Sequence, residues 1–323
     1  METTLYRCST HHPLSRAAWR SAWAWSGGLA VVALLAGAVR VLPWLLDPDV
    51  PARAALPFAR GVAELAIEAA VMIGWPIGWA LAAHRFAERG EARAMMLLGE
   101  SPAKTALTQW RVAAPFVIML TIASSLGALD ANAPGRMAQE LLSQGRAACA
   151  ATTTPRTYSI PFVSATWICT PGAPPVLYGS GPGPIRSVVF SAKNASIAGD
   201  MRRIDLEDAR FSLDSIHADV HANRVVLHGM SPFTHASNVP PLERAIVAVL
   251  AAALGAAGAI WACVTRRARG QLAAIAIAAA GPLAALGLMR ALERAEAPAA
   301  WFLLTPIASA VFPAVLAMIK RGC

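Results

Sequence analysis

Residues 245–264 of this chain read AIVAVLAAALGAAGAIWACV and contain no charged side chain. A helix needs roughly 20 apolar residues to cross the hydrocarbon core of a bilayer, so this run predicts a membrane-spanning helix. Five further apolar runs give a set of six, three before and three after a polar insert: 22–39, 69–83, 112–129, 245–264, 272–289 and 297–319. The chain is therefore predicted to be a polytopic α-helical membrane protein with six transmembrane helices in a 3+3 arrangement.

The second run is the only short one, because Glu68 interrupts it. Residues 63–83 are long enough if Glu64 and Glu68 lie near the outer end of the span. The composition agrees with a membrane protein, since 56% of the residues are hydrophobic, the mean hydropathy is +0.49 and only 15% are charged. Such values exclude an ordinary soluble globular protein.

The net charge of +9 predicts the orientation rather than a nucleic-acid partner. The two terminal tails and the loops 84–111 and 265–271 hold 13 of the 28 Lys and Arg residues, whereas the loops 40–60 and 290–296 hold five. By the positive-inside rule both termini are cytoplasmic and the insert is extracytoplasmic. The insert has ten basic and nine acidic residues, so it offers no basic face for nucleic acid.

The first apolar run has a second interpretation, a cleaved signal peptide. Arg16 and Arg20 precede it, and Ala36-Gly37-Ala38 would supply a small-residue cleavage site. We favour a span because the apolar stretch continues to Val39 and beyond, past the roughly 7–15 residues of a signal-peptide core. Cleavage would leave the other five spans oriented as before.

The loop between the second and third spans carries the most specific pattern. Arg85, Arg89 and Arg93 recur every four residues, which predicts one face of a short helix. The apolar cluster 95–98 follows, and Gly99 suits a left-handed helix stop. We predict a cytoplasmic helix that ends in an apolar knob made by Met95 and Leu98. It either lies on anionic lipid or inserts into a soluble partner as a coupling helix.

This pattern resembles a known family. Glu91-x-x-Ala94-Met95-x-x-x-Gly99-x-Ser101, between a second and a third span, is similar to the coupling segment of the LptF/LptG permeases of the lipopolysaccharide-export ABC transporter. The resemblance extends to Pro76 in the second span, the third-span exit 130–134, the last strands of a β-jellyroll at 204–209 and 224–229, and the sixth-span segment 301–306. This chain departs from the family in its shorter insert, its three lysines and its compact loop after the fourth span.

The resemblance implies a domain layout and a set of partners. Transmembrane helices over 1–129 would include a coupling helix at 84–104, a periplasmic jellyroll-like β-domain would cover 130–244, and further transmembrane helices would cover 245–323. The implied setting is the bacterial inner membrane, with a cytoplasmic ATPase dimer, a second permease subunit (a homologue or a second copy), periplasmic bridge proteins, and lipopolysaccharide or a related lipid. Contact with the ATPase would involve Glu88, Glu91, Arg93, Met95, Leu98 and Gly99.

Catalysis has little support in the sequence. There is no Gly-Lys-Ser/Thr phosphate loop, so ATP hydrolysis would belong to a partner, and there is no Gly-x-Ser-x-Gly or His-Glu-x-x-His motif. We expect no catalytic residue and no cofactor. The alternative to a permease is a membrane-anchored scaffold or sensor whose β-domain binds an envelope ligand without transport.

The insert itself reads as β-structure. Ile216, Ala218 and Val220 alternate with polar residues, which predicts a half-buried strand followed by a tight turn at 221–224. Further strands are predicted at 158–170 and 187–193, separated by a Gly- and Pro-rich loop at 171–184.

Two groups of residues in the insert each have two possible interpretations. His217, Asp219 and His221 would share one face of a strand and could bind a metal ion. A zinc site normally needs a third or fourth ligand, which this face does not supply with certainty, so we expect a solvated face and no metal. Cys149 and Cys169 lie in the extracytoplasmic insert, where a disulfide can form. Either they are bonded or they are buried free thiols.

Charged residues beside the first two spans are the last candidates for a functional site. Arg40 lies near the outer end of the first span, and Arg60 and Glu64 lie at the start of the second. Either an Arg40–Glu64 or Arg60–Glu64 pair reaches the interface, or Arg40, together with Arg53 and Arg60, binds phosphate groups of a lipid that enters from the outer leaflet.

Overall fold

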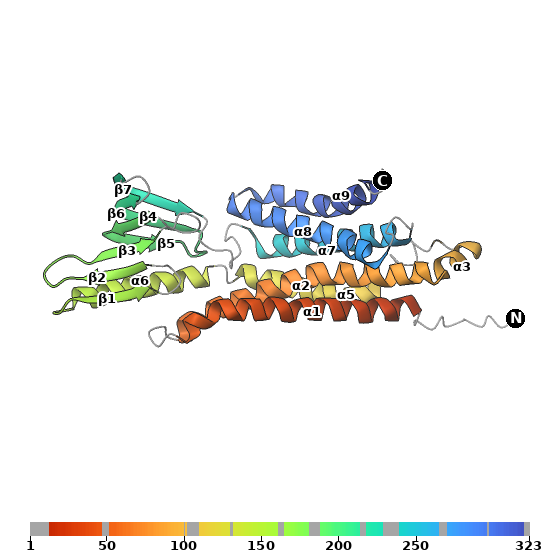
Figure 1. Cartoon of the computed structure of the whole chain (residues 1–323), viewed down its shortest axis with the longest axis horizontal. Coiled ribbons are helices and arrows are strands. Elements are labelled where there is room, and N and C mark those ends of the chain that lie inside the picture. The colour runs from red at the N-terminus through yellow and green to blue at the C-terminus, as the bar shows by residue number, and fades with distance from the viewer. Residues whose placement is uncertain are drawn as a thin grey trace. The chain divides into compact units, whose positions relative to one another are not determined.

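A computed structural model of the chain describes residues 13–46, 52–99, 101, 110–129, 132–160, 165–180, 188–213, 218–228, 239–264, 270–295 and 297–319. The chain divides into two compact units. The helical unit comprises 1–35, 66–126 and 240–323, and the β unit comprises 36–65 and 127–239. Figure 1 labels the helices and strands of both units.

The helical unit is built from long apolar helices. Its elements are α1 (Pro13–Leu45), α2 (Ala52–Glu88), α3 (Glu91–Leu97), α5 (Trp110–Leu129), α7 (Pro241–Val264), α8 (Gln271–Arg294), η1 (Ala299–Leu303) and α9 (Leu304–Ile319). The end of α1, the start of α2 and the last three residues of α5 are assigned to the β unit. Among the described residues, five helices are long and apolar enough to cross a membrane: α1, α2, α5, α7 and α8. The chain is a multi-pass helical membrane protein by this criterion. The sixth predicted span differs, because its residues form the short 3₁₀ segment η1 and the 16-residue α9.

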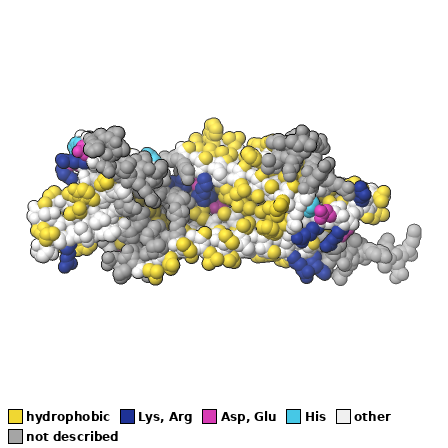
Figure 2. All heavy atoms as spheres, in the orientation of Figure 1, with side chains coloured by type: hydrophobic (Ala, Val, Ile, Leu, Met, Phe, Trp, Pro, Cys, Tyr) yellow, Lys and Arg dark blue, Asp and Glu magenta, His cyan; other side chains and the backbone are white. Residues whose placement is uncertain are grey.

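Small residues let the helices of this unit approach closely. A Cβ atom added to Gly78 of α2 would lie 2.3 Å from the Cα of Ala22 in α1, and one added to Gly74 would lie 2.5 Å from the Cα of Ser26. Membrane helices associate through such small-residue contacts, because lipid tails supply no hydrophobic drive between them. The side chains that point outward are apolar instead, as Figure 2 shows over the helical unit, with charged groups gathered near the end where α3 lies.

The β unit contains a helix, α6 (Ala133–Ala150), and a seven-stranded antiparallel half-barrel sheet. Its strands are β1 (Arg156–Ile160), β2 (Ala165–Cys169), β3 (Val176–Ser180), β4 (Val188–Ala192), β5 (Asn194–Ile197), β6 (Arg203–Leu213) and β7 (Ala218–His228). β1 to β4 pair in chain order, and the long β6 pairs with β4 and β5 on one side and with β7 on the other. The predicted β insert is confirmed in this form, whereas a jellyroll stays a prediction.

The insert differs from the sequence prediction in four places. The predicted strand at 158–170 is instead two antiparallel strands, β1 and β2. The first part of the insert is helical, because Ala138, Leu142 and Cys149 recur on one face of α6 and are buried against the sheet. The predicted loop 171–184 contains strand β3. The predicted turn at 221–224 lies inside β7, a strand of 11 residues, because the residues on both sides of Asn223 pair with β6. The ladder of hydrogen bonds outweighs the local turn preference.

Helix α6 is attached to the sheet at both ends. Near its start, the backbone N–H of Gly135 donates to the carbonyl of Gly199 at 2.8 Å, and a Cβ on Gly135 would lie 2.1 Å from that oxygen. Near its end, a disulfide joins Cys149 to Cys169 of β2, with 5.0 Å between their Cα atoms. The two thiols are therefore bonded in this structure, which was one of the two possibilities that the sequence left open.

The side-chain alternation of β6 changes phase at one residue. Ile204 and Leu206 face the core, and so do Ala209 and Phe211, although the two pairs are separated by an odd number of positions. The register with β7 is the same on both sides of Asp208, so no residue is inserted into the strand. Asp208 has φ +51, a left-handed conformation that is costly for side chains other than Gly, Asn and Asp. Its carboxylate pairs with the ammonium group of Lys193 and, at 2.5 Å, with Nε2 of His221. Hydrogen bonds from these two groups lower the pKa of Asp208 to about 2.

Substitution of Asp208 separates the role of its charge from that of its backbone. We expect Asp208→Asn to change the protection of β6 little, because Asn also adopts the left-handed conformation and the lost ion pairs are exposed. Asp208→Ala should open β6 on the order of tenfold more often, because alanine disfavours this φ value. Hydrogen–deuterium exchange of the full chain in detergent measures both, and equal exchange in the two variants would contradict the backbone argument.

The contribution of Asp208 to the stability of the folded β unit depends on pH. The folded-state pKa of Asp208 lies below its ordinary value of 3.8, so this stabilisation is complete above about pH 4 and is lost as the pH falls towards 2. Asp208→Asn should remove this component of the acid sensitivity of β6.

Candidate functional site

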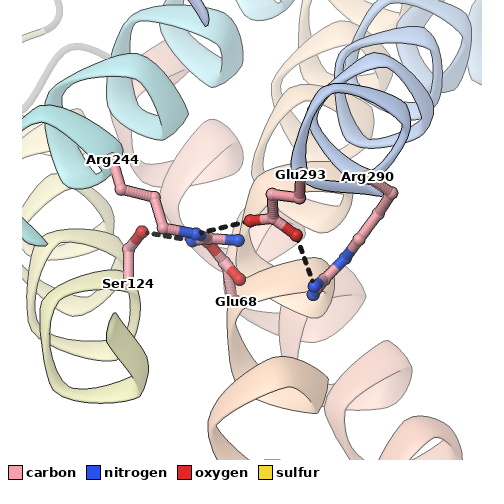
Figure 3. A network of polar contacts seen from close by, with 5 residues as sticks. All are labelled: Glu68, Ser124, Arg244, Arg290 and Glu293. Atoms are coloured by element: carbon pink, nitrogen blue, oxygen red, sulfur yellow. Dashed lines mark hydrogen bonds and ion pairs between the residues drawn. The ribbon is translucent and has the colours of Figure 1, made fainter. Parts of the chain in front are cut away.

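Four helices of the helical unit bring five polar side chains together (Figure 3). Arg244 comes from α7, Glu68 from α2, Ser124 from α5, and Glu293 and Arg290 from α8. The first four are completely buried or nearly so. We refer to these five residues as the charge network.

Arg244 lies at the centre of the charge network. Its Nη1 donates hydrogen bonds to the carboxylate of Glu68 and, at 2.7 Å, to the hydroxyl oxygen of Ser124. Its Nε donates to Oε1 of Glu293 at 3.1 Å, and Oε2 of Glu293 accepts from Nη1 of Arg290 at 2.9 Å. Two guanidinium groups thus face two carboxylates, so the formal charges of the network cancel.

The local sequence explains why these groups meet. Pro241 is the first residue of α7, where a proline needs no N–H partner, and this start places Arg244 in the first turn. Glu68 interrupts the apolar run of α2, and Glu293 lies in the last turn of α8. Charged groups in a low-dielectric interior are stable only when paired, and here the pairing requires helices from both sides of the insert. The network can therefore lock α2 and α5 to α7 and α8.

Sequence reasoning missed the charge network. It placed Glu68 near the outer end of a span, Arg244 in the insert, and residues 290–296 in a loop, whereas α8 continues to Arg294. A signal was available, because in alternating spans the start of the second, the end of the third, the start of the fourth and the end of the fifth all lie at one membrane face. The opposite charges at the start of the second, the start of the fourth and the end of the fifth span could therefore have been predicted to pair.

Of the three arginines predicted to bind lipid phosphate, the structure describes the side chain of one. Arg60 pairs with Glu64 one helical turn later, with 2.8 Å between Nε and Oε1, as in the interpretation that assigned it a structural role. The side chains of Arg40 and Arg53 lie outside the described residues.

The helix predicted between the second and third spans is present but broken. α2 ends at Glu88, Gly90 turns the chain with φ +80, and α3 follows from Glu91 to Leu97. Arg85 and Arg93 therefore belong to different helices, and the prediction that they share one helical face is wrong. Gly99 has φ +77, so the predicted left-handed stop is confirmed.

The end of α3 exposes three large apolar side chains. Met96, Leu97 and Leu98 are 55%, 89% and 81% exposed, and we call them the α3 tip. Met95, which the sequence assigned to the knob, is only 9% exposed and packs into the chain together with Ala92. Leu98 is therefore exposed as the sequence predicted, whereas Met95 does not belong to the knob, because it lies on the inner face of the helix.

The charged residues assigned to coupling lie at the end of α2 and on α3. Glu88 is exposed and pairs with Nε2 of His84 at 3.1 Å. Glu91 lies 3.9 Å from Arg89, and Arg93 is exposed. The Arg89–Glu91 pair is exposed and of small energetic value, whereas His84 is buried beside the exposed Glu88. The exposed charged groups can exchange partners at an interface.

Comparison of the chain with models of known protein families and with curated proteins finds no match. In the described part of the chain, no three His, Cys, Asp or Glu side chains lie close enough to hold a metal ion. The geometry of the charge network, the α3 tip and the β unit is therefore the basis for a functional proposal.

Proposed function

We propose that the chain is a non-catalytic permease subunit of an ABC transporter. It would extract lipopolysaccharide or a related lipid from the bacterial inner membrane and deliver it to a periplasmic bridge of β-domains. The observation that carries the proposal is the α3 tip, an exposed apolar surface on a short helix between two helices long enough to cross a membrane.

The shape of α3 favours a protein partner over a lipid surface. Helices that lie on lipid are typically long and amphipathic, with a basic face. α3 has seven residues, is bounded by the left-handed glycines Gly90 and Gly99, and is held by the buried Met95. Such a rigid knob suits a groove in a soluble protein, where apolar anchors at the centre of an interface contribute most of the binding energy.

The remaining features fit the same assignment. The sequence has no phosphate loop, so ATP hydrolysis would occur in a cytoplasmic ATPase dimer that contacts α3. A second permease subunit, homologous or identical, would complete the complex. Among the described strands, β7 pairs only with β6, so its other edge can pair with a periplasmic β-domain. Both termini would be cytoplasmic and the β unit periplasmic.

The proposal is tested by measuring how much ATPase copurifies with the parent chain and with a variant that lacks the apolar side chains of the α3 tip. We expect Leu97→Ser combined with Leu98→Ser to reduce the ATPase that copurifies after mild detergent extraction by tenfold or more, because two apolar anchors are lost, which costs roughly 2 kcal/mol or more. The folded amount of the chain should not change, because both side chains are exposed.

Leu242→Ser is the matched control, since Leu242 is equally an exposed leucine but lies at the start of α7, predicted to be on the other side of the membrane. It should leave copurification unchanged. If the tip variant also retains its full amount of ATPase, or if the parent chain copurifies with none, the scaffold or sensor interpretation is favoured and the permease proposal fails.

A further inference from the structure

The face of the sheet that points away from the core carries an ordered row of polar side chains. Tyr178 of β3, Ser191 of β4, Arg210 of β6 and His221 of β7 are direct cross-strand neighbours, each paired with the next. Because side chains alternate along a strand, residues two positions away share this face. They give a second row, Val189, Ser212 and Asp219.

These two rows line a cavity of about 420 Å³ on the β unit. The core of the β unit contains Leu177 and Phe211, which do not line the cavity, and Phe190, which belongs to the core and also borders the cavity. The volume of the cavity lies within the range of small-ligand sites, roughly 300–1,000 Å³.

Two charged side chains of the cavity, Arg210 and Asp219, differ from their neighbours on the sheet in their ion pairing. Arg203 and Arg224 of the same sheet both pair with Asp205 at 3.1 Å. Among the described residues, by contrast, Arg210 and Asp219 have no ion-pair partner. His221 is held in place by Asp208 of β6, so one wall of the cavity is fixed before any ligand binds.

The mixture of groups selects a ligand class. Tyr178, 43% exposed, and Val189 offer an apolar surface, Arg210 offers donors, Asp219 offers acceptors, and the two serine hydroxyls offer both. A phosphate group would meet the Asp219 carboxylate, and an acyl chain would leave the polar groups without hydrogen bonds. A sugar ring satisfies all of them, because its C–H face packs on an aromatic ring while its hydroxyls donate and accept.

We infer that this cavity is a saccharide-binding site, with Tyr178 as the stacking platform and Arg210 and Asp219 as the pair that binds hydroxyl groups. The saccharide is either free or the headgroup of a glycolipid, and both present the same chemistry. The inference is independent of transport, since a sensor could use the same site.

Binding to the purified full chain in lauryldimethylamine oxide, a detergent without sugar, tests the site. The first probes are the free disaccharides maltose and diacetylchitobiose, whose binding is measured by saturation-transfer NMR. The second probes are vesicles of phosphatidylcholine with or without 10% of a diglycosyl diacylglycerol. Flotation measures whether the β unit of the chain binds to these added vesicles. We expect saturable binding to a disaccharide if the site takes free sugar, and binding only to the glycolipid vesicles if it takes a headgroup.

The variants decide whether the cavity is responsible. Tyr178→Ala, Arg210→Ala and Asp219→Asn should each weaken binding on the order of tenfold, because each leaves a ligand group without its partner. Arg224→Ala, on the same sheet but outside the cavity, should bind as the parent does, and so should the α3 tip variant. Asp219→Asn preserves the side-chain shape, which excludes misfolding as the cause. Binding to neither kind of probe, or equal binding by the parent and all three cavity variants, overturns the inference.

Discussion

Replacing Arg244 by Met is expected to destabilise the helical unit by about 3–5 kcal/mol, the usual cost of removing one partner from a buried ion pair. The substitution keeps much of the side-chain volume, so the loss is mainly electrostatic. It takes from Glu68 the guanidinium that neutralises it in an interior where it is only 1% exposed. Glu293 loses one of its two arginines but keeps Arg290.

A double variant identifies the cause. Arg244→Met combined with Glu68→Leu removes both charges of one pair and replaces them with apolar side chains, so it should recover most of the lost free energy of unfolding. Arg60→Met is the control, because it removes a half-exposed arginine from an ion pair within α2, and it should cost about 1 kcal/mol or less. Denaturant unfolding of the full chain in mixed micelles measures all three. A double variant as unstable as Arg244→Met would show that packing, not charge, holds these helices together.

Removing the disulfide between Cys149 and Cys169 is expected to destabilise the β unit by about 3 kcal/mol. The bond closes a loop over a sequence separation of 20, and loops of about this length lose roughly that much chain entropy in the unfolded state. It also attaches the end of α6 to β2, so its loss should be felt first in α6. Replacing both cysteines by alanine and measuring the exchange protection and unfolding of the β unit gives the value.

Reduction supplies the control for this second prediction. Dithiothreitol should lower the stability of the parent chain by a similar amount and leave the double alanine variant unaffected. The bond itself is checked by alkylation without reduction, after which mass spectrometry should find Cys149 and Cys169 unmodified. Alkylation of both residues in the denatured, unreduced chain would show two free thiols and contradict the structure.

The charge network limits which helices can move relative to one another in the proposed function. A permease subunit must move its helices when a partner hydrolyses ATP, and the network joins helices that precede the insert to helices that follow it. Four charges that cancel within one buried group resist partial separation, because each step would expose an uncompensated charge to a low dielectric. We therefore expect α2, α5, α7 and α8 to move as one body at this level.

The sequence by itself determined the broad organisation of the protein. Apolar runs of spanning length are sufficient to predict five of the long helices, because in a membrane the length and polarity of a segment set its structure. The β insert, the glycine stop after α3 and an Arg60–Glu64 pair could be predicted for a similar reason, since each depends on neighbours one to four residues apart or on simple alternation.

Only the tertiary structure decided which distant residues meet. Arg244 and Glu68 are 176 residues apart, and nothing in their local sequence distinguishes a paired buried charge from one at an interface. Met95 is buried and Leu98 exposed because of the way in which α3 packs, although both belong to one apolar cluster. The continuous strand β7 and the cavity beside Arg210 likewise depend on pairing with β6. In each case the deciding free energy comes from long-range contacts, which a local pattern does not contain.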